Sequence, residues 1–188
     1  MGWEVSMLRM GSIFVLFTAC ASNAPDLPGY TGVPVEAPSS DYEPCASSRE
    51  VEVRCVIDGD TFSVGRCGEE GERVRILGIN APEIQHDGQP AECYGDDARI
   101  VLDQTIGNET VWLSFGSECQ DQYGRTLAWV WIAVDDDEPM LVSEWMLRNG
   151  HARLYDGEGA TSLVYRERLI SAELSAVEGG LGLWGECG

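Results

Sequence analysis

The order of strand-like and helix-like segments is the feature that most restricts how this chain can fold. Apolar side chains alternate at Val51, Val53, Cys55 and Ile57, and a period of two is typical of a β-strand with one buried face. Residues 94–106 instead carry apolar side chains at helical spacing and stop at a glycine. The same criteria predict strands at 51–57, 62–64, 73–79, 110–115 and 127–134, and helices at 94–106, 140–149 and 162–177.

Five strands with helices after the third and the fifth favour a mainly β, α+β domain. The expected architecture is an OB-type five-stranded barrel with about three capping helices, spanning residues 51–188. In the last helix, Leu163, Ile170, Leu174 and Val177 are expected to point inward. A fold does not by itself specify a function, so function has to be argued from particular residues.

Three short motifs follow one another along this domain. They are VIDGDT at residues 56–61, RILGINAPE at residues 75–83 and DQYGR at residues 121–125. Hydrolysis of a phosphodiester needs a cation to carry the growing negative charge and a base to activate water. Carboxylates can bind the cation and can also act as the base. The planar guanidinium of arginine can donate to two phosphate oxygens at once. The three motifs together contain these groups.

The spacing and order of the motifs resemble the staphylococcal nuclease (thermonuclease) family, over about residues 51–184. The resemblance implies an endonuclease or exonuclease that hydrolyses phosphodiester bonds of DNA or RNA, with Ca²⁺ as cofactor and nucleic acid as its partner. It assigns catalysis to Arg75, Glu83 and Arg125, metal binding to Asp60, Asn80 and the carbonyl of Ala81, and substrate contacts to Tyr123 and Tyr155.

One position departs from the family pattern, which usually has aspartate where this chain has Asn80. An amide oxygen can ligate Ca²⁺ but adds no formal charge, so we expect weaker metal binding or an altered metal preference. Taken singly, the site residues also have ordinary explanations. Asp60 could form a hairpin turn, Arg75 could be a solvated strand charge, and Tyr123 could simply flank a turn.

The charge balance opposes a general nucleic-acid-binding role. The chain has 32 acidic and 12 basic residues, a net charge of −20, and all of its basic residues are arginine. This sign disfavours non-specific attraction to polyanions, so a nuclease would depend on local arginines and metal. Two alternatives therefore stay open: a catalytically weak OB-fold module that binds nucleic acid or a partner, and a calcium-binding lipoprotein of the cell envelope.

The N-terminal residues predict export. Residues 1–19 combine a charged start, a short apolar run and a small-residue exit, which is typical of a signal peptide. Cys20 follows Thr18 and Ala19 in a sequence that resembles a bacterial lipobox, so we expect lipidation at Cys20. Residues 20–50 are rich in proline and predict an extended tether. The protein is then expected to be anchored to the outer membrane, or secreted, with no obligate protein partner.

Six cysteines remain if Cys20 carries lipid. An even number in an exported domain predicts disulfides, at least two and up to three, but six cysteines allow 15 pairings and the sequence does not choose among them. Zinc is disfavoured because the chain has no Cys-x-x-Cys pair. The six are Cys45, Cys55, Cys67, Cys93, Cys119 and Cys187.

Overall fold

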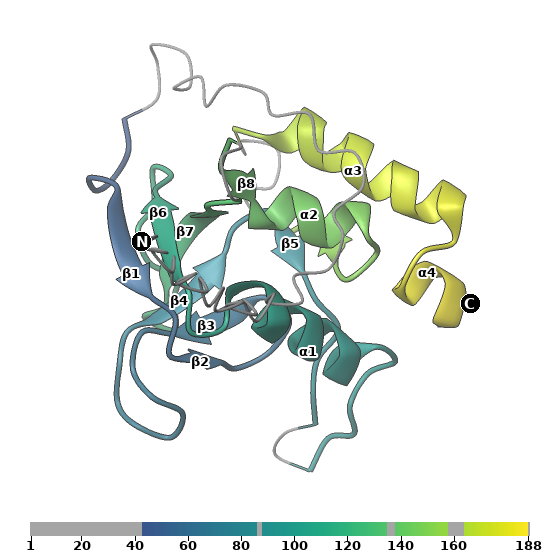
Figure 1. The fold of residues 1–188 in the computed structure, drawn as a ribbon, viewed down its shortest axis with the longest axis horizontal. Helices are drawn as coiled ribbons and strands as arrows, with labels where there is room; N and C mark the ends of the chain where they lie inside the picture. Colours follow the sequence, from purple (N-terminus) through teal and green to yellow (C-terminus); the bar gives the residue numbers. More distant parts are fainter. Residues whose placement is uncertain (1–42, 86–87, 135–137, 158–163, 188) are drawn as a thin grey trace, which may run out of the picture.

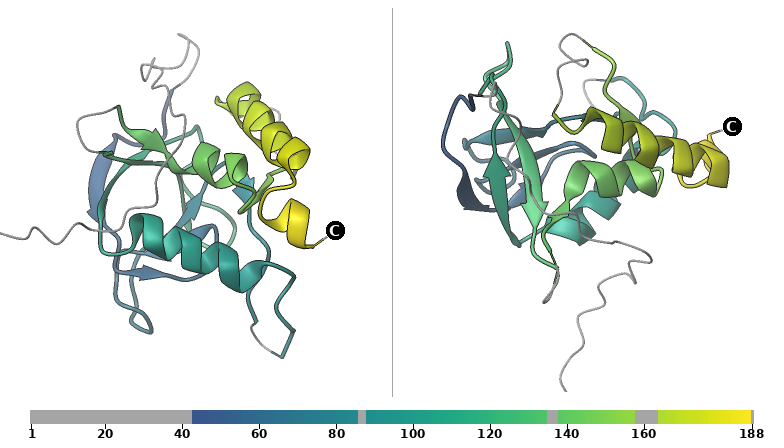
Figure 2. Two further views of the ribbon diagram at one scale, coloured as in Figure 1. Left: turned by 45° about the vertical axis from the view of Figure 1, so that its right-hand side comes forward. Right: turned by 90° about the horizontal axis from the view of Figure 1, so that it is seen from above.

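The computed structural model describes residues 43–85, 88–134, 138–157 and 164–187 (Figure 1). It has an α+β fold in which a mixed sheet carries the helices on one side, as the sequence predicts (Figures 1 and 2). The strands are β1 Arg49–Glu52, β2 Cys55–Val56, β3 Thr61–Ser63, β4 Arg73–Ile76, β5 Ile79–Asn80, β6 Thr110–Ser114, β7 Thr126–Ile132, β8 Met140–Leu141 and β9 Arg153–Leu154. The helices are α1 Gly95–Ile106, α2 Val142–Arg148, α3 Arg166–Gly179 and α4 Leu183–Glu186.

The sheet curls because one stretch of chain occupies both ends of it. The strand order is β1-β6-β7-β4-β3-β2, so β1 and β2, which are consecutive in the chain, lie at opposite ends. Between them the N–H of Val53 donates to Glu109 O at 2.9 Å and that of Arg54 donates to Ser63 O at 3.0 Å. The predicted first strand is thus a single bent strand, and counting it once leaves the five main strands of an OB-like fold.

The core lies between the curled sheet and the helices. β4 and β7 run parallel at its centre, with Arg75 opposite Leu127, and the other strand pairs of the sheet are antiparallel. Helix α3 packs on the outer side of α2 (Figure 2). Fully buried side chains from every layer meet in one cluster, which includes Phe62, Ile76, Leu102, Leu113, Leu147 and Leu169.

Two predicted elements are shorter than expected. The strand predicted at 73–79 ends at Ile76, because Gly78 adopts a φ of +85° that reverses the chain before β5. A Cβ at Gly78 would lie 2.5 Å from the side chain of Leu169, so the turn also packs closely against α3. The helix predicted at 140–149 begins only at Val142, because the two preceding residues pair with β7 as strand β8.

The inward face predicted for the last helix is wrong at two of its described positions. Leu174 and Val177 are exposed on α3 and Ile170 is half-buried, whereas the buried side chains are Leu169, Ala172 and Ala176. Two of these three are alanines, whose small size lets α3 approach α2 closely. The prediction for Leu163 lies outside the described residues.

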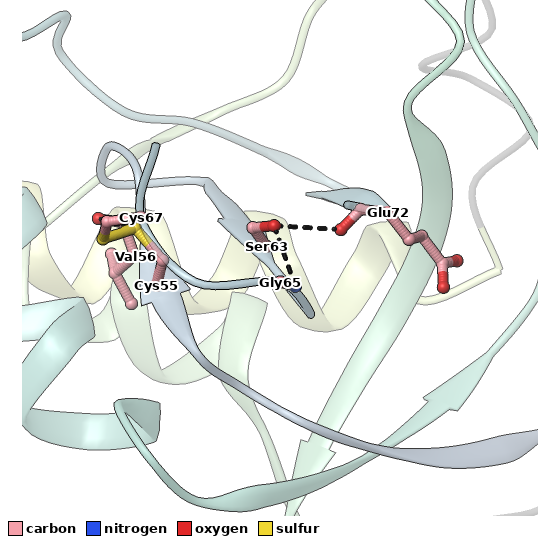
Figure 3. Close-up of a disulfide and its surroundings, with 6 residues drawn as sticks. All are labelled: Cys55, Val56, Ser63, Gly65, Cys67 and Glu72. Atoms are coloured by element: carbon pink, nitrogen blue, oxygen red, sulfur yellow. Dashed lines mark hydrogen bonds between the residues drawn. A yellow bond between two sulfur atoms is a disulfide. The ribbon is translucent and has the colours of Figure 1, made fainter. Parts of the chain in front are cut away.

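All six domain cysteines are paired, which confirms the prediction of at least two disulfides. The pairs are Cys45–Cys119, Cys55–Cys67 (Figure 3) and Cys93–Cys187. The predictions of a signal peptide, of lipid at Cys20 and of most of the tether fall outside the described residues. None of the helices in the described part of the chain has the length and apolar character needed to cross a bilayer.

Candidate active site

Asp60 is buried because the hairpin turn before it packs tightly against the rest of the domain. A Cβ at Gly59 would lie 2.5 Å from Cβ of Ala81 and 2.8 Å from Cβ of Ala98 in α1. Only a glycine lets the turn approach this closely. The approach places Asp60 against the segment that follows β5, although the two are 21 residues apart in sequence.

Both carboxylate oxygens of Asp60 accept hydrogen bonds. Oδ2 accepts the N–H of Ala81 at 2.8 Å and lies 3.0 Å from Nη2 of Arg75, and Oδ1 accepts the hydroxyl of Thr61 at 3.0 Å. Asp58 accepts the N–H of Asp60 at 3.0 Å. Burial, with a smaller contribution from the neighbouring Asp58, raises the pKa of Asp60 to about 7 against the opposing effect of Arg75.

Arg75 is held rigidly beside Asp60. Its Nη1 donates to the carbonyls of Ile76 and Ile79, both at 2.8 Å, and its Nη2 donates to Oδ1 of Asn80 at 3.2 Å. The turn between β4 and β5 therefore wraps around the guanidinium, whose side chain is only 12% exposed. With the ion pair to Asp60, these bonds engage both Nη groups, so an anionic ligand would take the Nε–H or replace one of them. This geometry does not fit the alternative of a solvated strand charge.

Arg125 is oriented by a residue to which sequence reasoning assigned no role. Asp121 accepts Nε of Arg125 at 2.7 Å through Oδ2, and its Oδ1 accepts the backbone N–H groups of Tyr123 and Arg125, both at 2.9 Å. These bonds close the turn before β7. The guanidinium carbon of Arg125 also lies 5.4 Å from the ring centre of Tyr123. The i,i+4 spacing of Asp121 and Arg125 was a usable signal for this pair.

One cleft brings most of the predicted residues together. It has a volume of about 660 Å³ and lies beside the parallel β4–β7 pair, with further walls from the β4–β5 turn and from residues 116–125. Two arginines, Arg75 and Arg125, line the same cleft, which gives it positive charge on two of its walls. Its lining includes the predicted residues Arg75, Asn80, Tyr123, Arg125 and Tyr155.

The remaining predicted residues lie next to this cleft. Asp60 contacts it through Arg75, and Ala81 contacts Asp60. Glu83 is exposed two residues beyond Ala81 and is not part of the cleft lining. Its backbone pairs with Glu92, whose N–H donates to Glu83 O at 2.8 Å. The structure therefore pairs Arg75 with Asp60 beside a cleft that Arg125 also lines, and it leaves Glu83 outside that lining.

The donor set beside Arg75 fits a hard cation. It consists of side-chain oxygens from a carboxylate, Asp60, and an amide, Asn80, and hard oxygens are the ligands that Ca²⁺ takes. At Ala81 it is the backbone N–H that meets Asp60. It does not fit zinc, because all six domain cysteines are in disulfides. Within the described residues, no group of three or more His, Cys, Asp or Glu side chains is placed to hold a metal. Any cation here would thus need oxygens from water or substrate.

The comparisons with known proteins agree with this geometry. The family model described as Staphylococcal nuclease homologue matches residues 73–186, more than half of the chain. The chain belongs to the staphylococcal nuclease family. Its match to this family includes Arg75, Asn80, Glu83 and Arg125.

Several relatives of the staphylococcal nuclease family are similar over most of the domain. The chain is 33% identical to the thermonuclease of Staphylococcus intermedius over 132 residues, which cover 70% of this chain and 74% of the relative. It is 30% identical to the thermonuclease of Staphylococcus hyicus over 139 residues, covering 74% and 78%. A probable endonuclease of Aspergillus niger is 36% identical over 119 residues, covering 59% of this chain and 42% of that protein.

Proposed function

We propose that this protein is a calcium-dependent nuclease that hydrolyses phosphodiester bonds of DNA or RNA. The observation that carries the proposal is the cleft in which Arg75 and Arg125 converge, with the buried carboxylate of Asp60 bonded to one of them. Family membership and the names of the relatives, thermonuclease and probable endonuclease, support the same activity.

In this proposal the chain binds and orients the scissile phosphate through its arginines. Arg75 and Arg125 donate guanidinium N–H groups to phosphoryl oxygens and stabilise the charge that develops as water attacks. Glu83 accepts a proton from that water. Tyr123 and Tyr155 contact the nucleotide from the cleft wall. Asp60, Asn80 and the carbonyl of Ala81 would hold Ca²⁺, which would supply further positive charge to the site when bound.

Digestion of labelled oligonucleotides by the purified domain, with Ca²⁺ and with a chelator, tests this proposal. Cleavage should require Ca²⁺, and Glu83→Gln and Arg125→Ala should each lower the rate at least ~10²-fold, the scale for losing a general base or a preorganised charge donor. Arg54→Ala is the matched control, because Arg54 is exposed, pairs with Glu52 at 2.6 Å and lies outside the cleft lining. Near-native turnover by folded Glu83→Gln or Arg125→Ala would refute the site assignment.

The same digestion separates a nuclease from the two alternatives, and a gel-shift measurement with the same oligonucleotides separates those two from each other. The net charge of −20 favours a calcium-binding envelope lipoprotein to some degree, because an acidic surface raises the local concentration of cations. Such a protein would bind Ca²⁺ and leave every oligonucleotide intact. A catalytically weak OB-fold module would retain oligonucleotides without cleaving them, with or without Ca²⁺.

We propose further that the protein is exported and anchored to a membrane through lipid on Cys20. The three disulfides support an oxidising compartment, since such bonds persist mainly outside the cytosol. Cys20→Ser should release the protein from the membrane fraction. If this variant fractionates with membranes as the native protein does, the lipid anchor is wrong.

A further inference from the structure

The backbone of Glu83 is fastened by a residue outside the three sequence motifs. The N–H of Glu83 donates to Oε2 of Glu92 at 3.1 Å, and the N–H of Glu92 donates to the carbonyl of Glu83 at 2.8 Å. Two residues nine positions apart thus clasp each other at the base of the loop between β5 and α1. The exposed side chain of Glu83 leaves the chain from this clasped backbone, which sets the position of its Cα and Cβ.

The start of α1 presses against the same point. A Cβ at Gly95 would lie 2.2 Å from the carbonyl oxygen of Glu83, so the first residue of α1 contacts this backbone directly. Gly95 also donates its N–H to the carbonyl of Glu92 at 3.1 Å. Glu92 and Gly95 together enclose the Glu83 peptide and leave it little freedom to rotate.

A disulfide ties this arrangement to the C-terminal end of the domain. Cys93, next to Glu92, is bonded to Cys187, 94 residues away and directly after α4. Helix α4 is itself anchored, since the N–H of Leu183 donates to Gly150 O at 2.9 Å and the guanidinium of Arg153 lies 4.3 Å from the Trp184 ring centre.

The anchor of α4 also reaches the predicted metal ligands. Arg153 belongs to β9, where it pairs with Asn80 of β5. The C-terminal segment therefore joins the strand that carries Asn80 to the loop that carries Glu83. Figure 1 shows α4 on the side of the molecule where this loop enters α1.

We propose that Glu92 and the Cys93–Cys187 disulfide form a brace that positions Glu83 for its reaction with water. The inference rests on the proposed function, in which Glu83 is the general base. Arg75 and Arg125 are held by other elements, the β4–β5 turn and the turn at Asp121. Loosening the brace should therefore slow turnover and leave substrate binding unchanged.

Glu92→Ala tests the first part of the brace. It should lower kcat about tenfold to a hundredfold, the cost of a misplaced catalytic group, with KM nearly unchanged. Glu92→Gln should retain most of the native kcat, because an amide oxygen can still accept the N–H of Glu83. Glu92 is exposed, so neither change should unfold the domain. An unchanged kcat in Glu92→Ala, or a higher KM in place of a lower kcat, would overturn the role of Glu92.

The double variant Cys93→Ser/Cys187→Ser tests the second part. It should reproduce the fall in kcat at native KM. Cys55→Ser/Cys67→Ser is the matched control, because that disulfide joins β2 to an exposed loop and the β2–β3 ladder holds Cys55 in place without it (Figure 3). If both disulfide variants turn over equally, the Cys93–Cys187 bond positions nothing. If the first variant does not fold, the Glu92 pair still decides the proposal.

Native protein and Glu83→Gln are measured in the same assay. Together they distinguish a failure of the brace from a failure of the proposed function. If native protein cleaves, Glu83→Gln does not and the brace variants keep the native kcat, the brace alone is wrong. If native protein does not cleave, the proposed function fails and the brace fails with it. If Glu83→Gln cleaves as native does, the protein is a nuclease in which Glu83 is not the general base, and the brace is wrong.

Discussion

Asp60 and Glu144 are equally buried carboxylates, each 6% exposed, but their surroundings differ in charge. Glu144 on α2 is bonded to two arginines: Oε1 accepts Nη2 of Arg148 at 2.7 Å and Oε2 accepts Nε of Arg168 at 2.9 Å. Asp60 meets one guanidinium, that of Arg75, which also serves a second side chain and two backbone carbonyls.

The charge sums give these two places opposite signs. Glu144 and its two arginines carry a net charge of about +1, so this carboxylate needs no further cation. With both carboxylates ionised, Asp60, Asp58 and Arg75 carry a net charge of about −1. The pKa of Asp60 is raised mainly by burial and also by Asp58, so its charged form lacks compensation here. The group around Glu144 fastens α2 to α3. The group around Asp60 has an uncompensated negative charge that a cation could neutralise.

Asp60→Asn should produce the largest effect, and the effect should be on activity alone. Losing the charged metal ligand should lower the cleavage rate at least ~10²-fold, the scale of losing a preorganised electrostatic contact. The amide can still accept the N–H of Ala81, so thermal stability should change little. Oligonucleotide cleavage and thermal melting measure the two quantities. A stable variant with native activity would remove Asp60 from the site.

Glu144→Gln should show the reverse pattern. Removing the charge leaves Arg168 of α3 without its buried counter-ion, which should cost about 3 kcal/mol of unfolding free energy, the lower end for breaking a buried pair. Denaturant titration measures this loss. The specific activity of the folded fraction should stay native. A larger loss of activity than of stability would contradict the division between the two carboxylates.

His151 extends the comparison to a half-buried group that is more stable in its neutral form. Burial lowers its pKa to about 4, beside the hydroxyl of Tyr94 at 3.0 Å and the ring of Trp145. Between pH 6.5 and pH 4 the unfolded chain binds a proton that the folded one does not, so stability falls as the pH falls through this window. Between pH 7.5 and pH 5 the loss should be about 2 kcal/mol.

His151→Asn isolates this contribution, because its side chain can still bond to Tyr94 and does not titrate. Denaturant midpoints of both proteins should be compared at pH 7.5 and pH 5. The variant should lose less stability on acidification than the native protein. Equal losses would show that His151 is not the group responsible.

Asn80→Asp should sharpen the account of the metal site, with the smallest effect. It restores a negative charge to the predicted ligand set and should tighten Ca²⁺ binding by about tenfold without substrate, because affinity rises with the number of charged ligands. Calorimetric titration at fixed ionic strength measures this. An affinity equal to or weaker than native would show that Asn80 is not a ligand.

Local patterns predicted the fold and most of the cleft. Strand alternation and helix punctuation are properties of neighbouring residues, so most main strands and α1 lie where the sequence placed them. The end of the strand before Gly78 was not predicted, because the apolar residues around this glycine continue the strand pattern. The positive φ of Gly78 reverses the chain there. The prediction of the buried face of α3 was wrong because the size of an apolar residue does not decide its burial. Leu174 is 54% exposed and Ala172 is buried.

Contacts between distant residues could not be predicted. Glu144 and Arg168 are 24 positions apart, and no local pattern joins them. The clasp joins Glu83 and Glu92, two acidic residues whose like charges predict repulsion. The hydrogen bond forms because the donor is the backbone N–H of Glu83. The pairing Cys93–Cys187 was one of many that six cysteines allow. These features belong to the tertiary structure. They determine how residues are positioned, whereas the sequence motifs determine which residues are present in the site.

Calorimetric titration of Ca²⁺ into native protein, Asp60→Asn and Glu144→Gln tests the central claim most directly. The native protein and Glu144→Gln should bind Ca²⁺ with the same affinity, and Asp60→Asn should bind at least about tenfold more weakly, since it lacks the charged ligand. Equal Ca²⁺ affinity in the native protein and Asp60→Asn, or a loss confined to Glu144→Gln, would contradict the account.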